Sequence, residues 1–257
     1  MNRNEIIRLT DEIGFLPEQK FGQNFLCDEA SIERIIDLCD LREGDHVLEI
    51  GPGLGSLTGM LAKPGIELTA VEIDKRLAEF IGNEYGCRVI ASDYTRLAAG
   101  DYDASSYDVA VSNIPYYLMT PIMKKLIIDL NNSRKLVLMV EKEALQRICA
   151  KPGTKQYGPL AVLCSLYGNM DVVFDLPGNY YYPVPKTTST VITLTRQGGY
   201  NIDEGFIRFV EQCFSNRRKK VTNNADVSIS ALTGLGYKDT CRAEEISPED
   251  FIKLYVV

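Results

Sequence analysis

The stretch "HVLEIGPGLGSLT", His46 to Thr58, joins a short apolar run to a glycine-rich turn. Gly51, Gly53 and Gly55 let the backbone turn tightly and approach a ligand, because no Cβ stands in the way. The dinucleotide-binding fingerprint has the spacing G-x-G-x-x-G, whereas Ser56 stands here where the last glycine would fall. The spacing argues against a pyrophosphate cradle, and a plain tight turn is the alternative to a ligand-binding loop.

Short β-like runs alternate with helical patterns after this first strand. The apolar runs are residues 46–50, 67–73, 88–91, 108–113 and 135–141. Near-continuous apolar strands that alternate with helices predict a parallel sheet covered on both faces, and therefore an α/β fold. We expect two later runs, 171–176 and 189–196, to form an antiparallel hairpin at the sheet edge, with a long insertion between them.

The pair Gly198-Gly199 predicts a linker between two parts of the chain. Residues 203–257 have helical periodicity and no strong strand. We therefore expect two domains, 1–198 and 199–257, of which the second is small and helical.

The composition narrows the class of protein. The 257 residues are 45% hydrophobic and 25% charged, as in ordinary globular proteins. No apolar run is long enough for a membrane span, and the first residues carry acids where a signal peptide needs an apolar core, so we expect a cytoplasmic protein. The seven cysteines are never spaced as C-x-x-C, which favours reduced thiols and no metal site. The single histidine, His46, enters a strand and is interpreted as structural, so the chemistry must work without an imidazole.

Two carboxylates stand near the ends of the second and third apolar runs. Glu72 stands 21 positions after Gly51, where an acid can accept hydrogen bonds from both ribose hydroxyls of an adenosine-containing cofactor. Asp93 could accept the adenine amino group of the same cofactor, and its alternative role is a helix N-cap. The turn and the acid together favour a nucleoside cofactor.

The stretch "SNIPYY", residues 112–117, follows another buried run. Pro115 restricts Ile114 to an extended conformation and so fixes the direction of its carbonyl group. With the Asn113 amide oxygen and the ring of Tyr116, this arrangement suits an exocyclic amino group on a planar base. Two such hydrogen bonds would favour a pyramidal adenine N6 whose lone pair can attack a sulfonium methyl group without a histidine. The alternative is an ordinary turn at the end of a strand.

With these motifs the chain resembles the KsgA-type small-subunit ribosomal RNA adenine dimethyltransferases, whose relatives include the Erm large-subunit methyltransferases. The similarity covers nearly the whole chain, and its motifs follow the family's order. They are "FGQNFL" (21–26), "EIGPGLGSLT" (49–58), "VEID" (71–74), "SDYT" (92–95), "NIPYY" (113–117), "EKEALQRICAKPGTKQYGPLAV" (141–162), "YPVPKTTS" (182–189) and "FSNRRKK" (214–220). The segment 232–247 resembles the KsgA branch rather than Erm.

The resemblance implies a Rossmann-like class I S-adenosylmethionine-dependent methyltransferase fold, with catalysis in residues 1–198 and RNA recognition in 199–257. It implies dimethylation of N6 of two adjacent adenines in small-subunit (16S) ribosomal RNA during late subunit biogenesis, with an immature 30S-type subunit as partner. The implied cofactor contacts are Asn24, Leu26, Gly51, Gly53, Glu72, Asp93 and Asn113. The implied catalytic residues are Asn113, Ile114 and Tyr116.

The aromatic position that clamps the target base departs from the family pattern. The family usually has Phe before the proline-rich turn, whereas Tyr181 stands at the matching position here with Tyr182 beside it. Either tyrosine can stack on the base, as Tyr116 can. Further departures touch substrate handling rather than the cofactor, and they are Val184, Thr187, Thr188 and Lys220.

The net charge of −7 argues mildly against a nucleic-acid partner, but whole-chain charge is a poor guide when basic residues cluster. The candidate RNA-binding residues are Lys151, Lys155, Arg217, Arg218, Lys219 and Lys220. The alternative for the run 217–220 is a solvated helix end. Two rival functions stay open: an Erm-like enzyme acting on large-subunit RNA, and a ribosome-assembly factor whose binding role outweighs catalysis.

Overall fold

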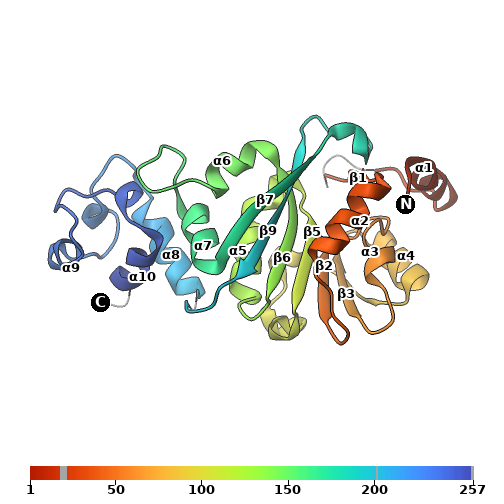
Figure 1. Ribbon diagram of the computed structural model, residues 1–257, viewed down its shortest axis with the longest axis horizontal. Coiled ribbons are helices and arrows are strands. Elements are labelled where there is room, and N and C mark those ends of the chain that lie inside the picture. The colour runs from red at the N-terminus through yellow and green to blue at the C-terminus, as the bar shows by residue number, and fades with distance from the viewer. Residues whose placement is uncertain (18–21, 201, 256–257) are drawn as a thin grey trace.

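A seven-stranded sheet forms the centre of the computed structural model, which describes residues 1–17, 22–200 and 202–255 (Figure 1). The strand order is β4-β3-β2-β5-β6-β9-β7. The strands are β2 (His46–Ile50), β3 (Glu67–Glu72), β4 (Arg88–Ala91), β5 (Val109–Asn113), β6 (Lys135–Glu141), β7 (Gly168–Leu176) and β9 (Ser189–Arg196). Strands β2 to β6 are parallel, which confirms the predicted α/β fold.

Strand β9 runs antiparallel to both of its neighbours, so β7 has the same direction as the parallel strands. Strand β9 pairs with β6 on one side and with β7 on the other, so that β7 forms the edge. The predicted antiparallel hairpin with a long insertion is therefore confirmed. A bulge between Val172 and Phe174 shifts the register of β7.

Side chains of successive strand residues point to opposite faces of the sheet, and each face has its own buried cluster. Leu48 and Ile50 belong to one cluster, whereas Val47 belongs to the other. The first cluster is covered by α5 (Met119–Asp129) and α7 (Pro159–Tyr167), and the second by α2 (Glu29–Leu38) and α3 (Thr58–Leu61). Both faces are covered, as a parallel sheet requires.

Local signals set the ends of the helix that follows β3. Helix α4 (Lys75–Tyr85) begins after Asp74, whose side chain accepts a hydrogen bond from the Arg76 N–H. It ends at Gly86 in the left-handed conformation, with φ of 63°. Another short helix, α6 (Leu145–Ile148), precedes α7 in the chain.

The C-terminal helices lie at one end of the molecule and the N-terminus at the other (Figure 1). They are α8 (Glu204–Cys213), α9 (Ile229–Gly234) and α10 (Pro248–Tyr255), and residues 202–255 contain no strand. Helices α8 and α10 pack on α7, and their apolar residues join the buried cluster that reaches the sheet. The predicted helical character of this part is confirmed, while the boundary at 198/199 stays a prediction.

A second, two-stranded sheet forms near the N-terminus, where α1 (Arg3–Glu12) also lies. It pairs β1 (Phe25–Leu26) with β8 (Tyr181–Tyr182) in antiparallel fashion. Phe21, the first residue of the "FGQNFL" motif, lies outside the described residues.

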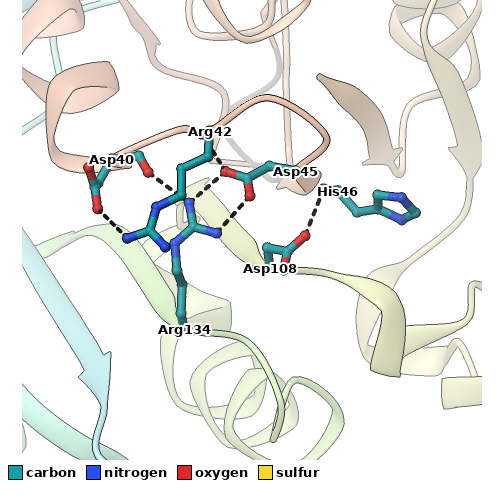
Figure 2. A network of polar contacts seen from close by, with 6 residues as sticks. All are labelled: Asp40, Arg42, Asp45, His46, Asp108 and Arg134. Carbon is teal, nitrogen blue, oxygen red and sulfur yellow. Dashed lines mark hydrogen bonds and ion pairs between the residues drawn. The ribbon is translucent and has the colours of Figure 1, made fainter. Parts of the chain in front are cut away.

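A network of charged residues connects the loops at the amino ends of β2, β5 and β6 (Figure 2). Arg134 donates to both Asp45 carboxylate oxygens at 2.8 and 2.5 Å and to the Asp40 carbonyl at 2.7 Å. Asp108 accepts from the His46 N–H at 2.9 Å. The hydrogen bonds from Arg134 lower the pKa of Asp45. These contacts fix the edge of the sheet opposite the carboxyl ends of its parallel strands.

Candidate active site

A cavity lies at the carboxyl ends of β2, β3 and β5, the edge at which ligands bind in open parallel sheets. Residues of β1 and of the glycine turn complete its wall. Seven predicted cofactor contacts line it together: Asn24, Leu26, Gly51, Gly53, Glu72, Asp93 and Asn113. The structure thus brings residues from five separate motifs to one cavity.

The glycine turn is shaped by its neighbours as well as by its backbone. Gly53 has φ of +59°, and a Cβ there would lie 2.8 Å from the Phe25 ring. Gly55 has φ of +90°, and a Cβ there would lie 2.3 Å from the Tyr85 ring. Side chains at either position would push β1 or α4 away, so the turn needs glycine for packing and for conformation.

Glu72 ends β3 with its carboxylate buried in the cavity wall. One oxygen accepts the Gly53 N–H at 3.1 Å and the other accepts the Asp74 N–H at 2.9 Å. Burial raises the pKa of Glu72, and the two backbone hydrogen bonds oppose this rise. A carboxylate has about four lone-pair sites, so Glu72 keeps acceptor capacity for a ligand.

Asp93 fulfils the alternative role predicted for it. One carboxylate oxygen accepts the Thr95 N–H at 2.9 Å and caps the short helical turn Tyr94–Arg96. Its other oxygen lies 3.4 Å from Arg96 Nε. The residue also lines the cavity, so a contact with adenine stays a prediction beside the observed cap.

Some residues of the "SNIPYY" motif line the cavity and others lie outside its lining. Asn113 ends β5, and its amide nitrogen donates to the Asn24 carbonyl at 3.1 Å, so the amide oxygen is the atom that can accept from a substrate. Pro115 lines the cavity, whereas Ile114 and Tyr116 lie outside its lining. Tyr116 shares a hydrogen bond of 2.8 Å with Ser189 Oγ. Asn113 is therefore the predicted catalytic residue that lines the cavity, and contacts of Ile114 and Tyr116 with a base stay predictions.

The two candidate clamping tyrosines differ in burial. Tyr181 is 1% exposed, packs with Leu26 in the buried cluster, and lies outside the cavity lining. Tyr182 is half-buried and packs against the cluster that contains Phe25. Both belong to β8, whose register pairs Tyr181 with Leu26 and Tyr182 with Phe25. Stacking of Tyr181 on a base stays a prediction.

The basic residues lie in two loops that meet at Glu244. Arg217 lies 3.0 Å from the Glu244 carboxylate, and the Glu244 carbonyl accepts from the Gly153 N–H, in the loop that carries Lys151 and Lys155. Lys220 is paired with an aspartate, so the more open members of the group are Lys151, Lys155, Arg218 and Lys219. The run 217–220 lies just beyond the end of α8 at Cys213, and RNA binding by this run stays a prediction beside the helix-end alternative.

Three further residues of the cavity were not assigned a role from the sequence. Glu49, two positions before Gly51, is 2% exposed and accepts from Thr58 Oγ at 2.7 Å. Burial raises its pKa to about 8, and the charge of Glu72 adds to this effect. Ser56 Oγ is buried and has no hydrogen-bond partner among the described residues. Tyr117 is 55% exposed at the rim. For Glu49, the signal available in the sequence was an acidic residue in an apolar run directly before the glycine turn.

Other chemistries have less support in the described residues. His46 lies at the opposite edge of the sheet, with Nε2 3.4 Å from Glu67 Oε2, which agrees with its structural interpretation. Residues 1–17, 22–200 and 202–255 hold no group of three or more His, Cys, Asp or Glu side chains placed to bind a metal ion. Within the same ranges, the helices are too short or too polar to cross a bilayer.

Comparisons with known proteins agree on one family. The family model of ribosomal RNA adenine dimethylase matches residues 15–256. A ribosomal RNA small subunit methyltransferase A from Chlorobium phaeobacteroides is 37% identical over 243 residues, which cover 93% of this chain and 92% of the relative. One of the same name from Malacoplasma penetrans is also 37% identical, covering 86% of this chain and 82% of that relative.

Solved structures support the fold. A dimethyladenosine transferase from Plasmodium falciparum has a TM-score of 0.70 and 23% identity, covering 90% of this chain and 95% of that structure. The 23S rRNA methyltransferase ErmE has a TM-score of 0.61 and 23% identity, covering 90% of this chain and 98% of that structure.

Proposed function

The chain belongs to the ribosomal RNA adenine dimethylase family, and we propose that it dimethylates N6 of two adjacent adenines in small-subunit ribosomal RNA. The single observation that supports this most is the position of Asn113. Asn113 lines the cavity together with Glu72 and Asp93, and its amide nitrogen donates to the Asn24 carbonyl, which leaves the amide oxygen as an acceptor. One amide group can therefore face both a cofactor and a substrate amine.

The cavity residues fit S-adenosylmethionine as the methyl donor. The remaining acceptor capacity of the Glu72 carboxylate suits ribose hydroxyls, and Asp93 offers an acceptor for an adenine amino group. The free hydroxyl of Ser56 adds a polar group to the wall. When bound, the cofactor would supply a methyl group on a positively charged sulfur, which is an electrophile.

The residues of "SNIPYY" would hold the amine that attacks this methyl group. The Asn113 amide oxygen and the Ile114 carbonyl would accept from the two N–H groups of adenine N6, and Tyr116 would stack on the base. These bonds favour a pyramidal nitrogen, whose lone pair is free to form the N–C bond. The C–S bond would break at the same time and leave its electron pair on sulfur, and the nitrogen would then release one proton to water. The hydrogen bonds to N6 strengthen as the nitrogen changes geometry, so they act mainly on the transition state. The chemistry needs no imidazole, in keeping with the position of His46.

The RNA would be held by the basic residues of the two loops that meet at Glu244. Phosphate contacts supply affinity with little sequence reading, so the partner would be an immature small subunit that presents the adenines in the right place, in the cytoplasm. The curated relatives are named for the small subunit, which favours this substrate over that of an Erm-like enzyme. If the assembly-factor alternative holds, variants that lose catalysis but still bind the subunit should keep most of the protein's role in the cell.

The experiment maps methylated adenines in ribosomal RNA from cells that have or lack the gene, and then measures Asn113→Ala in single turnover. At saturating cofactor we expect roughly a hundredfold lower rate, as for the loss of one transition-state hydrogen bond, with subunit binding nearly unchanged. Asn83→Ala, on the exposed face of α4, is the control. Unchanged methylation in cells that lack the gene would contradict the proposed substrate. A normal rate for Asn113→Ala would contradict the role of the motif.

A further inference from the structure

The N-terminal part of the chain contacts both the cavity and the segment that carries Tyr181 and Tyr182. We call residues 177–185, which carry the candidate clamping tyrosines, the tyrosine loop. Strand β1 pairs with β8 of this loop, and the Cys27 N–H donates to the Tyr180 carbonyl at 2.8 Å. On its other side, β1 lines the cavity through Phe25 and Leu26. One short strand therefore lies between the proposed cofactor and the tyrosine loop.

Arg3, at the start of α1, holds the tyrosine loop from a second direction. One guanidinium nitrogen donates to the Tyr181 carbonyl at 2.8 Å and to the Asn179 carbonyl at 3.0 Å. Successive carbonyls of an extended chain point to opposite sides, and the carbonyl of Tyr180 faces β1. The backbone around Tyr181 is thus held by β1 on one side and by Arg3 on the other.

Apolar packing fixes α1 in the position from which Arg3 reaches the loop. Ile6 and Phe15 are buried in one cluster with Phe25 and Leu54. Leu54 belongs to the glycine turn, so α1 packs against the wall of the cavity. Tyr182 packs against the same cluster. A change in the glycine turn or in β1 therefore acts on the same packed unit that carries Arg3.

We propose that Arg3 is a positioning residue, which fixes the backbone of the tyrosine loop so that cofactor binding at β1 orders the loop for the target base. This inference rests on the proposed function. A ligand that contacts Asn24 and Leu26 stabilises β1, and the stabilised strand holds β8 more firmly. Arg3 is required because a ladder of two residues, by itself, gives few hydrogen bonds to the loop.

The central test compares Arg3→Met with Arg8→Met. Arg8 is on the same helix, but its side chain is 68% exposed. Its ion pair is with Glu12, one turn further along α1. We expect Arg3→Met to lower kcat/KM for the small subunit about tenfold, as for the loss of charge-assisted hydrogen bonds to two carbonyls, while cofactor affinity changes less than twofold. Arg8→Met should match the wild type. Equal values for both variants would overturn the inference.

A second measurement does not depend on methyl transfer. Adding S-adenosylhomocysteine to the wild type should slow hydrogen exchange at the backbone amides of residues 180–182, and the slowing should be much smaller in Arg3→Met. Arg3→Lys, which keeps one charged donor, should recover part of both effects. If Arg3→Met binds the ligand and shows wild-type slowing, the loop is ordered without Arg3 and the inference is wrong.

A double-variant experiment separates positioning from a general loss of stability. If Arg3 acts through the tyrosine loop, Arg3→Met should change kcat/KM little in a Tyr181→Ala background, because the positioned ring is already absent. Additive losses would overturn the inference. If the wild type does not methylate the subunit at all, the proposed function fails, whereas the hydrogen-exchange result still decides the role of Arg3.

Discussion

Replacing Glu49 by glutamine should stabilise the protein at alkaline pH and change it little near pH 4.5. The Glu49 carboxyl is 2% exposed, and burial raises its pKa from 4.5 to about 8. Glutamine keeps the shape and can still accept the hydrogen bond from Thr58. It cannot ionise, so it removes the cost of placing a negative charge in this wall of the cavity.

The size and sign of the effect follow from proton linkage. Between pH 4.5 and pH 8 the unfolded chain has released the Glu49 proton, while the folded protein still holds it. The folded state binds more protons, so the free energy of unfolding falls as the pH rises through this window. Each pH unit costs about 1.4 kcal/mol, which gives roughly 3–5 kcal/mol over the whole window.

Denaturant unfolding followed by circular dichroism at pH 4.5, 6, 7 and 8.5 measures this effect. The difference in unfolding free energy between Glu49→Gln and the wild type should grow with pH and level off above pH 8. Glu79→Gln, on the exposed face of α4, should run parallel to the wild type at every pH. A constant difference for Glu49→Gln across the range would refute the claim that the buried carboxyl is protonated.

Three further predictions concern other parts of the molecule. Glu72→Gln should weaken cofactor binding about 10- to 100-fold in calorimetric titration, because a ribose hydroxyl loses a charged acceptor; unchanged affinity would remove Glu72 from the site. Arg218→Ala should lower the slope of log affinity for RNA against log salt by about 0.7. Arg217→Ala should lower it by less, because Arg217 is already paired with Glu244. Wild-type slopes for both variants would place this run away from RNA. Arg134→Met should cost about 2 kcal/mol of unfolding free energy by leaving Asp45 unpaired, with cofactor affinity unchanged. That cost should shrink as the pH falls through the lowered pKa of Asp45, and equal stability at pH 7 would count against the network.

The sequence predicted the large sheet well because its central strands, β2, β5 and β6, are buried on both faces. The runs 46–50, 88–91 and 135–141 match β2, β4 and β6 to the residue, since near-continuous apolar runs between helical patterns have few other interpretations. The cofactor motifs were also found together, because parallel strands place their carboxyl ends at one edge. Local pattern and chain direction were sufficient for these features.

Features that depend on distant contacts were not predicted. Strands β1 and β8 are two residues each, too short for any period to appear in the sequence. The unusual protonation of Glu49 follows from burial by the finished fold, not from its neighbours in the chain. In the same way, the end of α8 at Cys213, before the run 217–220, depends on packing and was not predicted from the sequence.

The pairing of β1 with β8 also has a consequence for how the protein folds during synthesis. Cys27 and Tyr180 are 153 positions apart, so the N-terminal segment leaves the ribosome long before its partner strand exists. Closing so long a loop costs entropy, and a ladder of two residues offers little in return. We therefore expect the seven-stranded sheet to form first and this small sheet to close last. A nascent chain would then gain a complete site only after β9 has been made, which ends at Arg196 of the 257 residues.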